Sequence, residues 1–188
     1  MGKSSKENEI KLAFPSTTHA RRALTNAGAR ESRARRFEDN VVFDRDDRTL
    51  MRTGRVLRVR RDGKRVVLTL KTPVEGTHPH KLRNEFETEV ADQGAVTRIL
   101  TELGFAPSYR YQKYRTSFAL GGVDAELDET PIGTFVELEG APDAIDRAAA
   151  ALGASSGDYI LATYRELHEL DAARRGVPAG DLLLADEP

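Results

Sequence analysis

The chain has 188 residues, of which 39% are hydrophobic and 31% are charged, so it has the length and composition of one soluble domain. Its 29 basic and 30 acidic residues nearly cancel, which gives no reason to expect a nucleic acid or an anionic membrane as partner. The absence of cysteine excludes a disulfide framework and a thiolate metal site. No apolar run approaches the roughly 20 residues of a membrane helix, and the N-terminus lacks the apolar core of a signal peptide. We therefore expect a cytoplasmic protein with a single domain over 1–188 and loose tails at 1–5 and about 172–188.

The N-terminal segment is predicted to form a strand followed by a helix. Charged and apolar side chains alternate over residues 6–14, which is the pattern of a strand with one apolar and one charged face. Ser16, Thr17 or Thr18 is a candidate N-cap for the helix that follows, and Gly28 lies near its end.

The next segments are predicted to be extended. Residues 34–47 have no helical pattern, and a β-hairpin is indicated over 55–71 because two β-rich runs flank the tight-turn pair Asp62–Gly63. Residues 72–82 contain two prolines, a glycine and two histidines, and we expect them to form a mobile loop.

The rest of the chain is predicted to contain four more strands and three helices. Together with the first half, this gives roughly eight strands, which predicts an α+β fold with a largely antiparallel sheet. The expected strands are 83–90, 110–120, 123–129 and 133–140, and the expected helices are 93–105, 142–153 and 156–170.

Charged residues recur at every second position in seven of the predicted strand segments, backed by apolar residues. Two arrangements fit this pattern. In one, the sheet exposes an ion-paired face to water. In the other, the sheet curls so that its charged face lines the interior of a barrel and its apolar face packs against helices. Since buried charges are costly unless they are paired or bind a charged group, the second arrangement would imply a polar ligand and ions.

The order of these motifs resembles the CYTH family, also called triphosphate tunnel metalloenzymes. The first is the E-x-E-x-K motif at Glu7, Glu9 and Lys11. Paired arginines follow in RVLRVRR, then the lysine of LTLK, RNEFE, QKYR and LDETPIGTFVELEG. The resemblance spans about residues 6–168. It implies a closed or nearly closed antiparallel eight-stranded β-barrel with helices packed outside, and a hydrophilic tunnel that binds a triphosphate and Mg²⁺ or Mn²⁺.

The resemblance also implies roles for individual residues. Arginine forks and lysine ammonium groups suit phosphate oxygens, whereas carboxylates suit hard divalent cations. Glu9 and Lys11 are the expected catalytic residues, with Lys11 acting either as a base or as a group that orients the nucleophile. The expected phosphate-binding residues are Lys11, Arg58, Arg60, Lys71, Arg83, Lys113 and Arg115. The expected metal ligands are Glu7, Glu9, Glu137 and Glu139, with Asp128, Glu85 and Glu87 as further candidates; structural ion pairing is the alternative for Glu85, Glu87 and Glu126.

Other polar residues are predicted to have no role in the site. His78 and His80 lie in the Pro- and Gly-containing loop without a partner cluster, so we expect them to face solvent. The arginine run within 29–36 is expected to be a solvated face. Glu89 and Asp124 are expected to face solvent, and Tyr159 and Tyr164 to pack in the core or at the rim.

Three functions are compatible with these motifs. The favoured one is a metal-dependent hydrolase of tripolyphosphate, thiamine triphosphate or a nucleoside triphosphate. The first alternative is a class IV adenylate cyclase, and the second is a non-catalytic polyphosphate or nucleotide sensor. In each case we expect a small-molecule triphosphate as partner, no nucleic acid or membrane, and a monomer or homodimer.

Overall fold

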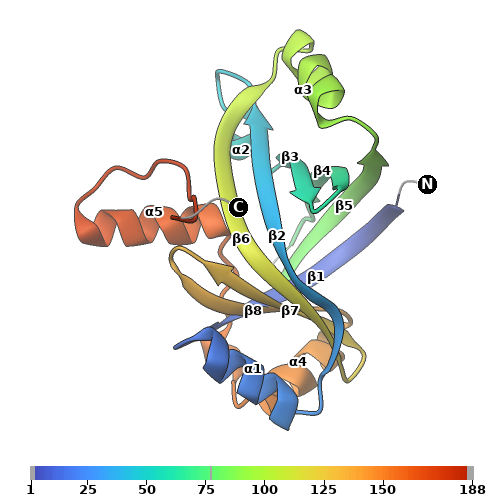
Figure 1. Cartoon of the computed structure of the whole chain (residues 1–188), viewed down its shortest axis with the longest axis vertical. Coiled ribbons are helices and arrows are strands. Elements are labelled where there is room, and N and C mark those ends of the chain that lie inside the picture. Colours follow the sequence, from blue (N-terminus) through green and yellow to red (C-terminus); the bar gives the residue numbers. More distant parts are fainter. Residues whose placement is uncertain (1–2, 77, 186–188) are drawn as a thin grey trace.

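Eight antiparallel strands form a closed barrel in the computed structural model, which describes residues 3–76 and 78–185. Around the barrel the strand order is β1-β5-β4-β3-β2-β6-β7-β8, so that β1 closes the ring by pairing with both β5 and β8 (Figure 1). The strands are β1 (Lys3–Phe14), β2 (Arg30–Asp44), β3 (Val56–Asp62), β4 (Arg65–Pro73), β5 (Lys81–Val90), β6 (Ala106–Leu120), β7 (Val123–Thr130) and β8 (Gly133–Glu139).

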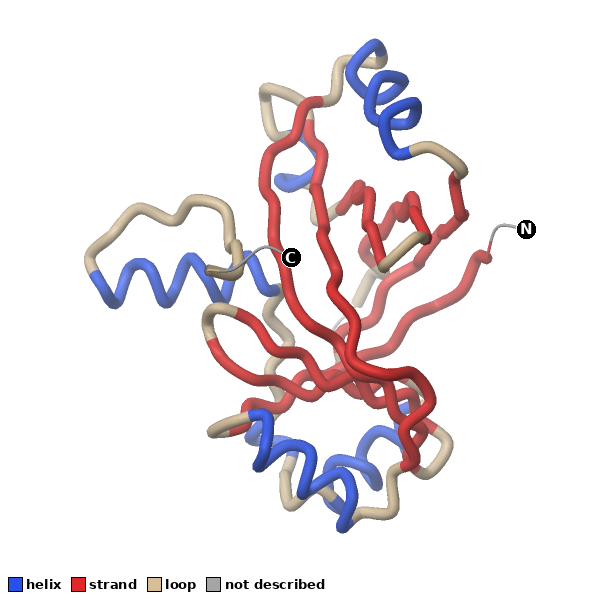
Figure 2. Tube along the Cα trace, viewed as in Figure 1, coloured by secondary structure: helices blue, strands red, loops and turns tan. Residues whose placement is uncertain are grey.

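The helices lie around the outside of the barrel (Figure 2). Ser16 is the N-cap of the first, where its hydroxyl accepts a hydrogen bond from the His19 amide. In the described part of the chain, no helix is both long and apolar enough to cross a membrane. The helices are α1 (Thr17–Asn26), α2 (Thr49–Arg52), α3 (Gln93–Glu102), α4 (Pro142–Ala151) and α5 (Tyr164–Arg175), with a 3₁₀ turn, η1, at Ser156–Asp158.

The hydrophobic core lies between the barrel and its helices, not inside the barrel. Ile10 of β1, Leu127 of β7 and Val136 of β8 are fully buried in a cluster to which α1 and α4 contribute. A second cluster packs Val96 and Leu100 of α3 against the outer faces of β2 and β3. Because side chains alternate along a strand, this packing turns the charged faces inward. The α+β fold, the closed eight-stranded barrel and the outer helices are therefore confirmed.

The predicted helix over 156–170 is wrong in its first half. After η1, Ile160 pairs with Lys11 of β1 through two backbone hydrogen bonds of 3.0 and 2.9 Å. The helix begins only at Tyr164, because Thr163 and Glu166 form a capping box that satisfies the first amide groups. The connection between α4 and α5 therefore adds to the barrel wall beside β1.

Both chain ends are attached to the barrel within the described residues. β1 begins at Lys3, which pairs with Glu87, so residues 3–5 are not a loose tail. At the other end α5 continues to Arg175, and the buried Leu182 exchanges backbone hydrogen bonds with β6, each of 2.9 Å. The expected loose segment from about 172 is therefore helical to Arg175 and attached to β6 at Leu182, whereas residues 177–181 between them are exposed and form no helix or strand. Residues 1–2 and 186–188 lie outside the described part.

Candidate functional site

A cavity of about 560 Å³ occupies the barrel interior and is lined by side chains from all eight strands. The alternation of side chains brings together charges that are far apart in the sequence. Every predicted phosphate-binding residue lines this cavity, and so does every predicted metal ligand except Asp128, which is fully buried beside it. Glu126 and Asp124 also line it, although Asp124 is exposed as expected.

Lys11 lies at the centre of one ion-paired group. Its ammonium nitrogen is 3.2 Å from both Glu9 and Glu137, and Lys81 approaches Glu9 at 2.8 Å. Burial alone would lower the pKa of Lys11, but the carboxylates of Glu9 and Glu137 raise it above its ordinary value. A lysine that keeps its proton is a poor base, so this geometry favours an orienting or electrostatic role.

A second group contains Lys71 and Arg58. Both carboxylate oxygens of Glu7 accept hydrogen bonds from Lys71 at 2.5 Å, and Glu85 is 3.3 Å from the same ammonium. Arg58 donates to the Tyr111 hydroxyl at 3.0 Å. Burial opposes ionisation of Tyr111, yet Arg58 and Lys113 lower its pKa below the ordinary value. In this group, the side chains predicted to bind phosphate therefore contact carboxylates or a tyrosine hydroxyl.

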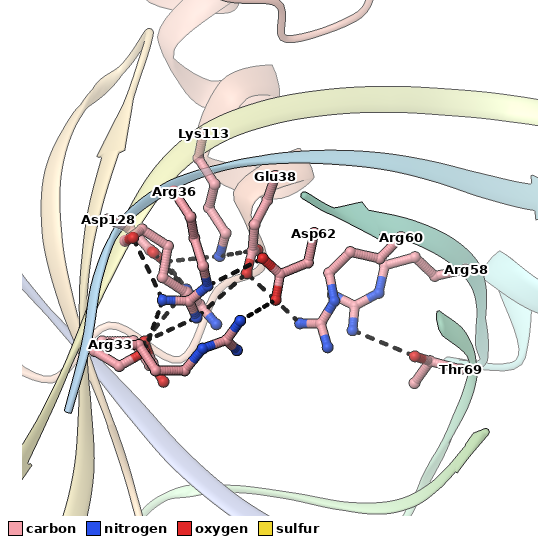
Figure 3. A network of polar contacts seen from close by, with 12 residues as sticks. Arg33, Arg36, Glu38, Arg58, Arg60, Asp62, Thr69, Lys113 and Asp128 are labelled. Atoms are coloured by element: carbon pink, nitrogen blue, oxygen red, sulfur yellow. Dashed lines mark hydrogen bonds and ion pairs between the residues drawn. The ribbon is translucent and has the colours of Figure 1, made fainter. Parts of the chain in front are cut away.

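Asp128 is 0% exposed and joins the basic strand β6 to helix α5. It accepts two hydrogen bonds of 2.6 Å from Arg115 and one each of 2.7 Å from Lys113 and Tyr164. The packing role expected for Tyr164 is therefore only part of its contribution, since its hydroxyl reaches the tunnel. With four donors bound, Asp128 acts here as the anchor of two cations (Figure 3).

Glu139 differs from the other predicted metal ligands because it has no hydrogen bond or ion pair with the described residues. The strand register places it opposite Glu9 and Asp124. Burial and the neighbouring Glu7 carboxylate raise the pKa of Glu139 to about 7, because each disfavours its charged form. A nearby divalent cation would reverse this effect.

The tunnel acids fit a hard divalent cation by their chemistry. Glu7, Glu9 and Glu139 supply carboxylate oxygens, which Mg²⁺ and Mn²⁺ prefer. Within residues 3–76 and 78–185, however, no three acidic or histidine side chains are already arranged to hold a metal. Glu7 and Glu9 contact lysines instead, so a metal would have to replace those contacts.

The raised pKa of Glu139 predicts how stability depends on pH in the metal-free protein. The folded state holds this proton more tightly than the unfolded state, whose pKa is near 4.5. The stability associated with protonated Glu139 is thus fully present below pH 4.5 and is lost as the pH rises through 7. We expect the free energy of unfolding to fall between pH 5 and 8, with about 3 kcal/mol as the upper bound from Glu139. Urea unfolding across this range should show a smaller fall for Glu139→Gln; an identical fall would contradict the assignment.

Sequence reasoning missed several tunnel residues on β2 and β3. Arg36 belongs to the run expected to be solvated, but its side chain points inward, with Nε 3.2 Å from Asp62. The reason is an irregularity in the β2–β6 register between Arg33 and Arg36, which changes the direction of the chain there. Glu38, on the same face as Arg36, is 1% exposed. Arg36 and Glu38 are two residues apart, and this spacing could have revealed that both face the tunnel. In the same way, Lys81 is two residues before Arg83 and lies on the same face of β5.

The expectation that His80 faces solvent is wrong, because its side chain is 2% exposed. One ring nitrogen is 2.8 Å from Asp146 of α4 and the other is 3.3 Å from Asn8 of β1. Tyr159 donates to the same Asp146 oxygen at 2.9 Å. This cluster links α4 to the outside of the barrel. Glu89 is exposed as expected.

The closed barrel with a charged internal cavity places the protein in the class of hydrophilic tunnel barrels. The CYTH domain model matches residues 5–174, and the chain therefore belongs to the CYTH domain family. A Methanocaldococcus jannaschii protein, provisionally named an adenylate cyclase, is 27% identical over 106 residues, which are 56% of this chain and 60% of that protein. The chain thus aligns with less than two thirds of this relative.

Two solved structures share the fold. A Vibrio parahaemolyticus protein, provisionally named an adenylate cyclase, has a TM-score of 0.73 and 17% identity, covering 88% of this chain and 98% of its own. The second is a Hippeastrum protein, provisionally named an adenylyl cyclase and described as having a dominant triphosphatase activity. It has a TM-score of 0.63 and 20% identity, and the match covers 92% of this chain and 97% of the Hippeastrum chain. At these identities the likeness concerns the fold alone.

Proposed function

We propose that this protein is a divalent-metal-dependent enzyme that binds a small triphosphate in the tunnel and hydrolyses its terminal phosphoanhydride. Candidate substrates are tripolyphosphate, thiamine triphosphate and nucleoside triphosphates. The observation that carries the proposal is the composition of the tunnel, where inward-facing lysines and arginines alternate with carboxylates around one cavity. A triphosphate with its metal requires both kinds of group.

The ion pairs of the tunnel predict that metal and phosphate bind together. Lys71 contacts Glu7, and Lys11 contacts Glu9. If a phosphate alone took the lysines, it would leave buried carboxylates without partners, which is costly. A metal alone would likewise leave buried ammonium groups unpaired. When both bind, each group exchanges one partner for another, so each ligand should raise the affinity of the other.

The residues of the chain supply positioning and charge for the reaction. Arg58, Arg60, Lys113 and Arg115 would hold the phosphates, with Asp128 fixing the last two. Lys11 would neutralise charge that develops at the reacting phosphate, in keeping with its raised pKa. Bound Mg²⁺ or Mn²⁺, held by Glu7, Glu9, Glu137 and Glu139, would add further charge neutralisation, which phosphoryl transfer chiefly needs.

Conversion of ATP to cyclic AMP and pyrophosphate is a second candidate, favoured by the provisional adenylate cyclase name of the Methanocaldococcus jannaschii relative. The two reactions differ in their products. Incubation with ATP or tripolyphosphate and Mg²⁺ or Mn²⁺, scored for cyclic AMP, pyrophosphate and phosphate, distinguishes them. Cyclic AMP as the main product would replace the hydrolase proposal.

Ligand-induced stabilisation tests the tunnel site itself. At a hundredfold excess over Kd, tripolyphosphate with Mg²⁺ should stabilise the fold by about 2.7 kcal/mol, or roughly 5–10 °C in melting temperature. Orthophosphate should do much less, because it reaches only part of the basic set. The effect should survive 0.15 M salt, since the pairs are buried. Equal small shifts for both anions, with or without Mg²⁺, would reject a triphosphate site.

A further inference from the structure

One wall of the tunnel contains all the buried side-chain nitrogen and oxygen atoms that lack a hydrogen bond within the described residues. Buried polar groups are normally paired, so such a concentration calls for a physical explanation. The atoms belong to neighbouring strands β2 and β3, which we call the β2–β3 wall (Figure 3). They are Arg36 Nε, Glu38 Oε1 and Oε2, Asn40 Nδ2 and Oδ1, Arg58 Nε, Arg60 Nε and Asp62 Oδ1.

Glu38 is the clearest case. Its carboxylate lies 3.7 Å from Arg36, 3.9 Å from Lys113 and 4.0 Å from Arg60, which is too far for hydrogen bonds. Burial would raise the pKa of Glu38, but the surrounding cations, Arg115 first, lower it to about 2. The carboxylate is therefore ionised and has unused lone pairs inside the cavity that it lines.

The register continues the wall on both sides of Glu38. Asp62 lies directly opposite it on β3, and Asn40, the next inward residue of β2, lies opposite Arg60. Asn40 is fully buried, and neither its amide nitrogen nor its oxygen has a partner. On the cavity side, the wall thus presents the two carboxylate oxygens of Glu38, which accept no hydrogen bond, beside the unbonded Nε atoms of Arg58 and Arg60. Asp62 Oδ1 forms an ion pair with Arg36 Nε at 3.2 Å, although this contact is not aligned as a hydrogen bond.

This mixture does not suit phosphate alone. A phosphate oxygen can accept from the arginines, but the Glu38 and Asp62 carboxylates would repel it. Ionised carboxylates only accept hydrogen bonds, so their partner must be a donor such as a hydroxyl, an amino group or water. Fully ionised tripolyphosphate has no such donor. The cavity, at about 560 Å³, is also within the size range of sites for larger organic ligands.

We propose that the β2–β3 wall is a subsite for a hydroxyl- or amino-bearing organic group attached to the triphosphate. The inference rests on the proposed function, since it extends the same tunnel. Its ligand chemistry has two possible sources, the ribose hydroxyls of a nucleoside triphosphate and the aminopyrimidine of thiamine triphosphate. Glu38 would then select organic triphosphates over the bare phosphate chain, by accepting their donors and by repelling an extra phosphate.

The test compares four ligands by calorimetric titration in the presence of Mg²⁺. They are tripolyphosphate and the hydrolysis-resistant β,γ-methylene analogues of ATP, 3′-deoxy-ATP and thiamine triphosphate. The wild type should bind at least one organic analogue about tenfold or more tightly than tripolyphosphate. Weaker binding of the 3′-deoxy compound than of the ATP analogue would identify the hydroxyl, and preference for the thiamine compound would identify the amino group.

Glu38→Gln should reduce the preference for that organic analogue about tenfold, because one acceptor becomes a donor. Tripolyphosphate should bind equally well or more tightly, since a negative charge is removed. Glu129→Gln is the matched control: Glu129 pairs with Arg35 on the outer face of β7, and its loss should leave the ratio unchanged. If Glu38→Gln does not fold, Asp62→Asn takes its place.

Two results would overturn the subsite. One is a wild type that binds tripolyphosphate as tightly as every organic analogue. The other is a variant that changes all affinities by the same factor, which would mean that only water occupies the wall. In both cases tripolyphosphate still binds, and the proposed function stands. Absence of binding by all four ligands would instead reject the proposed function.

Discussion

Replacing Glu9 with glutamine is expected to lower turnover about 100-fold or more, equivalent to about 2.7 kcal/mol of activation free energy. The side chain is 10% exposed and contacts Lys81 and Lys11. Burial opposes its ionisation, but these lysines lower its pKa, so the carboxylate remains charged at neutral pH. Glutamine keeps the size and removes the charge that a hard cation requires. Turnover should be measured at saturating Mg²⁺ and tripolyphosphate.

Glu31→Gln provides the matched control for this substitution. It makes the same change in net charge, but Glu31 is exposed, does not line the cavity and pairs with Arg21 of α1. Exposed pairs contribute little, so both turnover and melting temperature should stay near wild type. If Glu9→Gln folds and retains turnover within about threefold of wild type, Glu9 does not hold the metal.

The sequence predicted which side chains share one face of a strand, but not whether that face lies inside or outside the barrel. Alternation in the first strand was enough to place Glu7, Glu9 and Lys11 on one face. It did not determine whether that face lay inside or outside, because both arrangements give the same pattern. The barrel closure decides this, through the pairing of β1 with β5 at one end and with β8 at the other.

The partners of individual charges could not be read from the sequence. They depend on the stagger between strands, which brings Lys71 of β4 to Glu7 of β1 across an intervening strand. The contact of Tyr164 with Asp128 was missed for a different reason. Tyr164 belongs to helix α5, so the alternation of residues along the strands gives no information about it. Within the arginine run, the change of face before Arg36 follows a register irregularity that the sequence does not signal, although the spacing of Arg36 and Glu38 places those two side chains on one face.

Asp128→Asn is expected to weaken both the fold and the binding of phosphate. Asp128 is the common acceptor for Arg115, Lys113 and Tyr164, and it has no exposed surface. Removing one member of a buried charge pair costs about 3–5 kcal/mol, because its partners remain buried without compensation. For a chain of this size, that corresponds to a fall of roughly 6–20 °C in melting temperature.

A loss of stability alone would not distinguish an anchor of the phosphate-binding cations from an ordinary buried ion pair. Asp39→Asn makes the comparison, because Asp39 is also buried and accepts two hydrogen bonds from Arg110, at 2.8 and 3.1 Å. This pair lies on the outer face of β2, away from the cavity. Both variants should lose stability in urea, but only Asp128→Asn should lose affinity for tripolyphosphate with Mg²⁺, by about tenfold or more. Equal affinity in the two folded variants would mean that Asp128 stabilises the barrel without positioning Lys113 and Arg115 for phosphate.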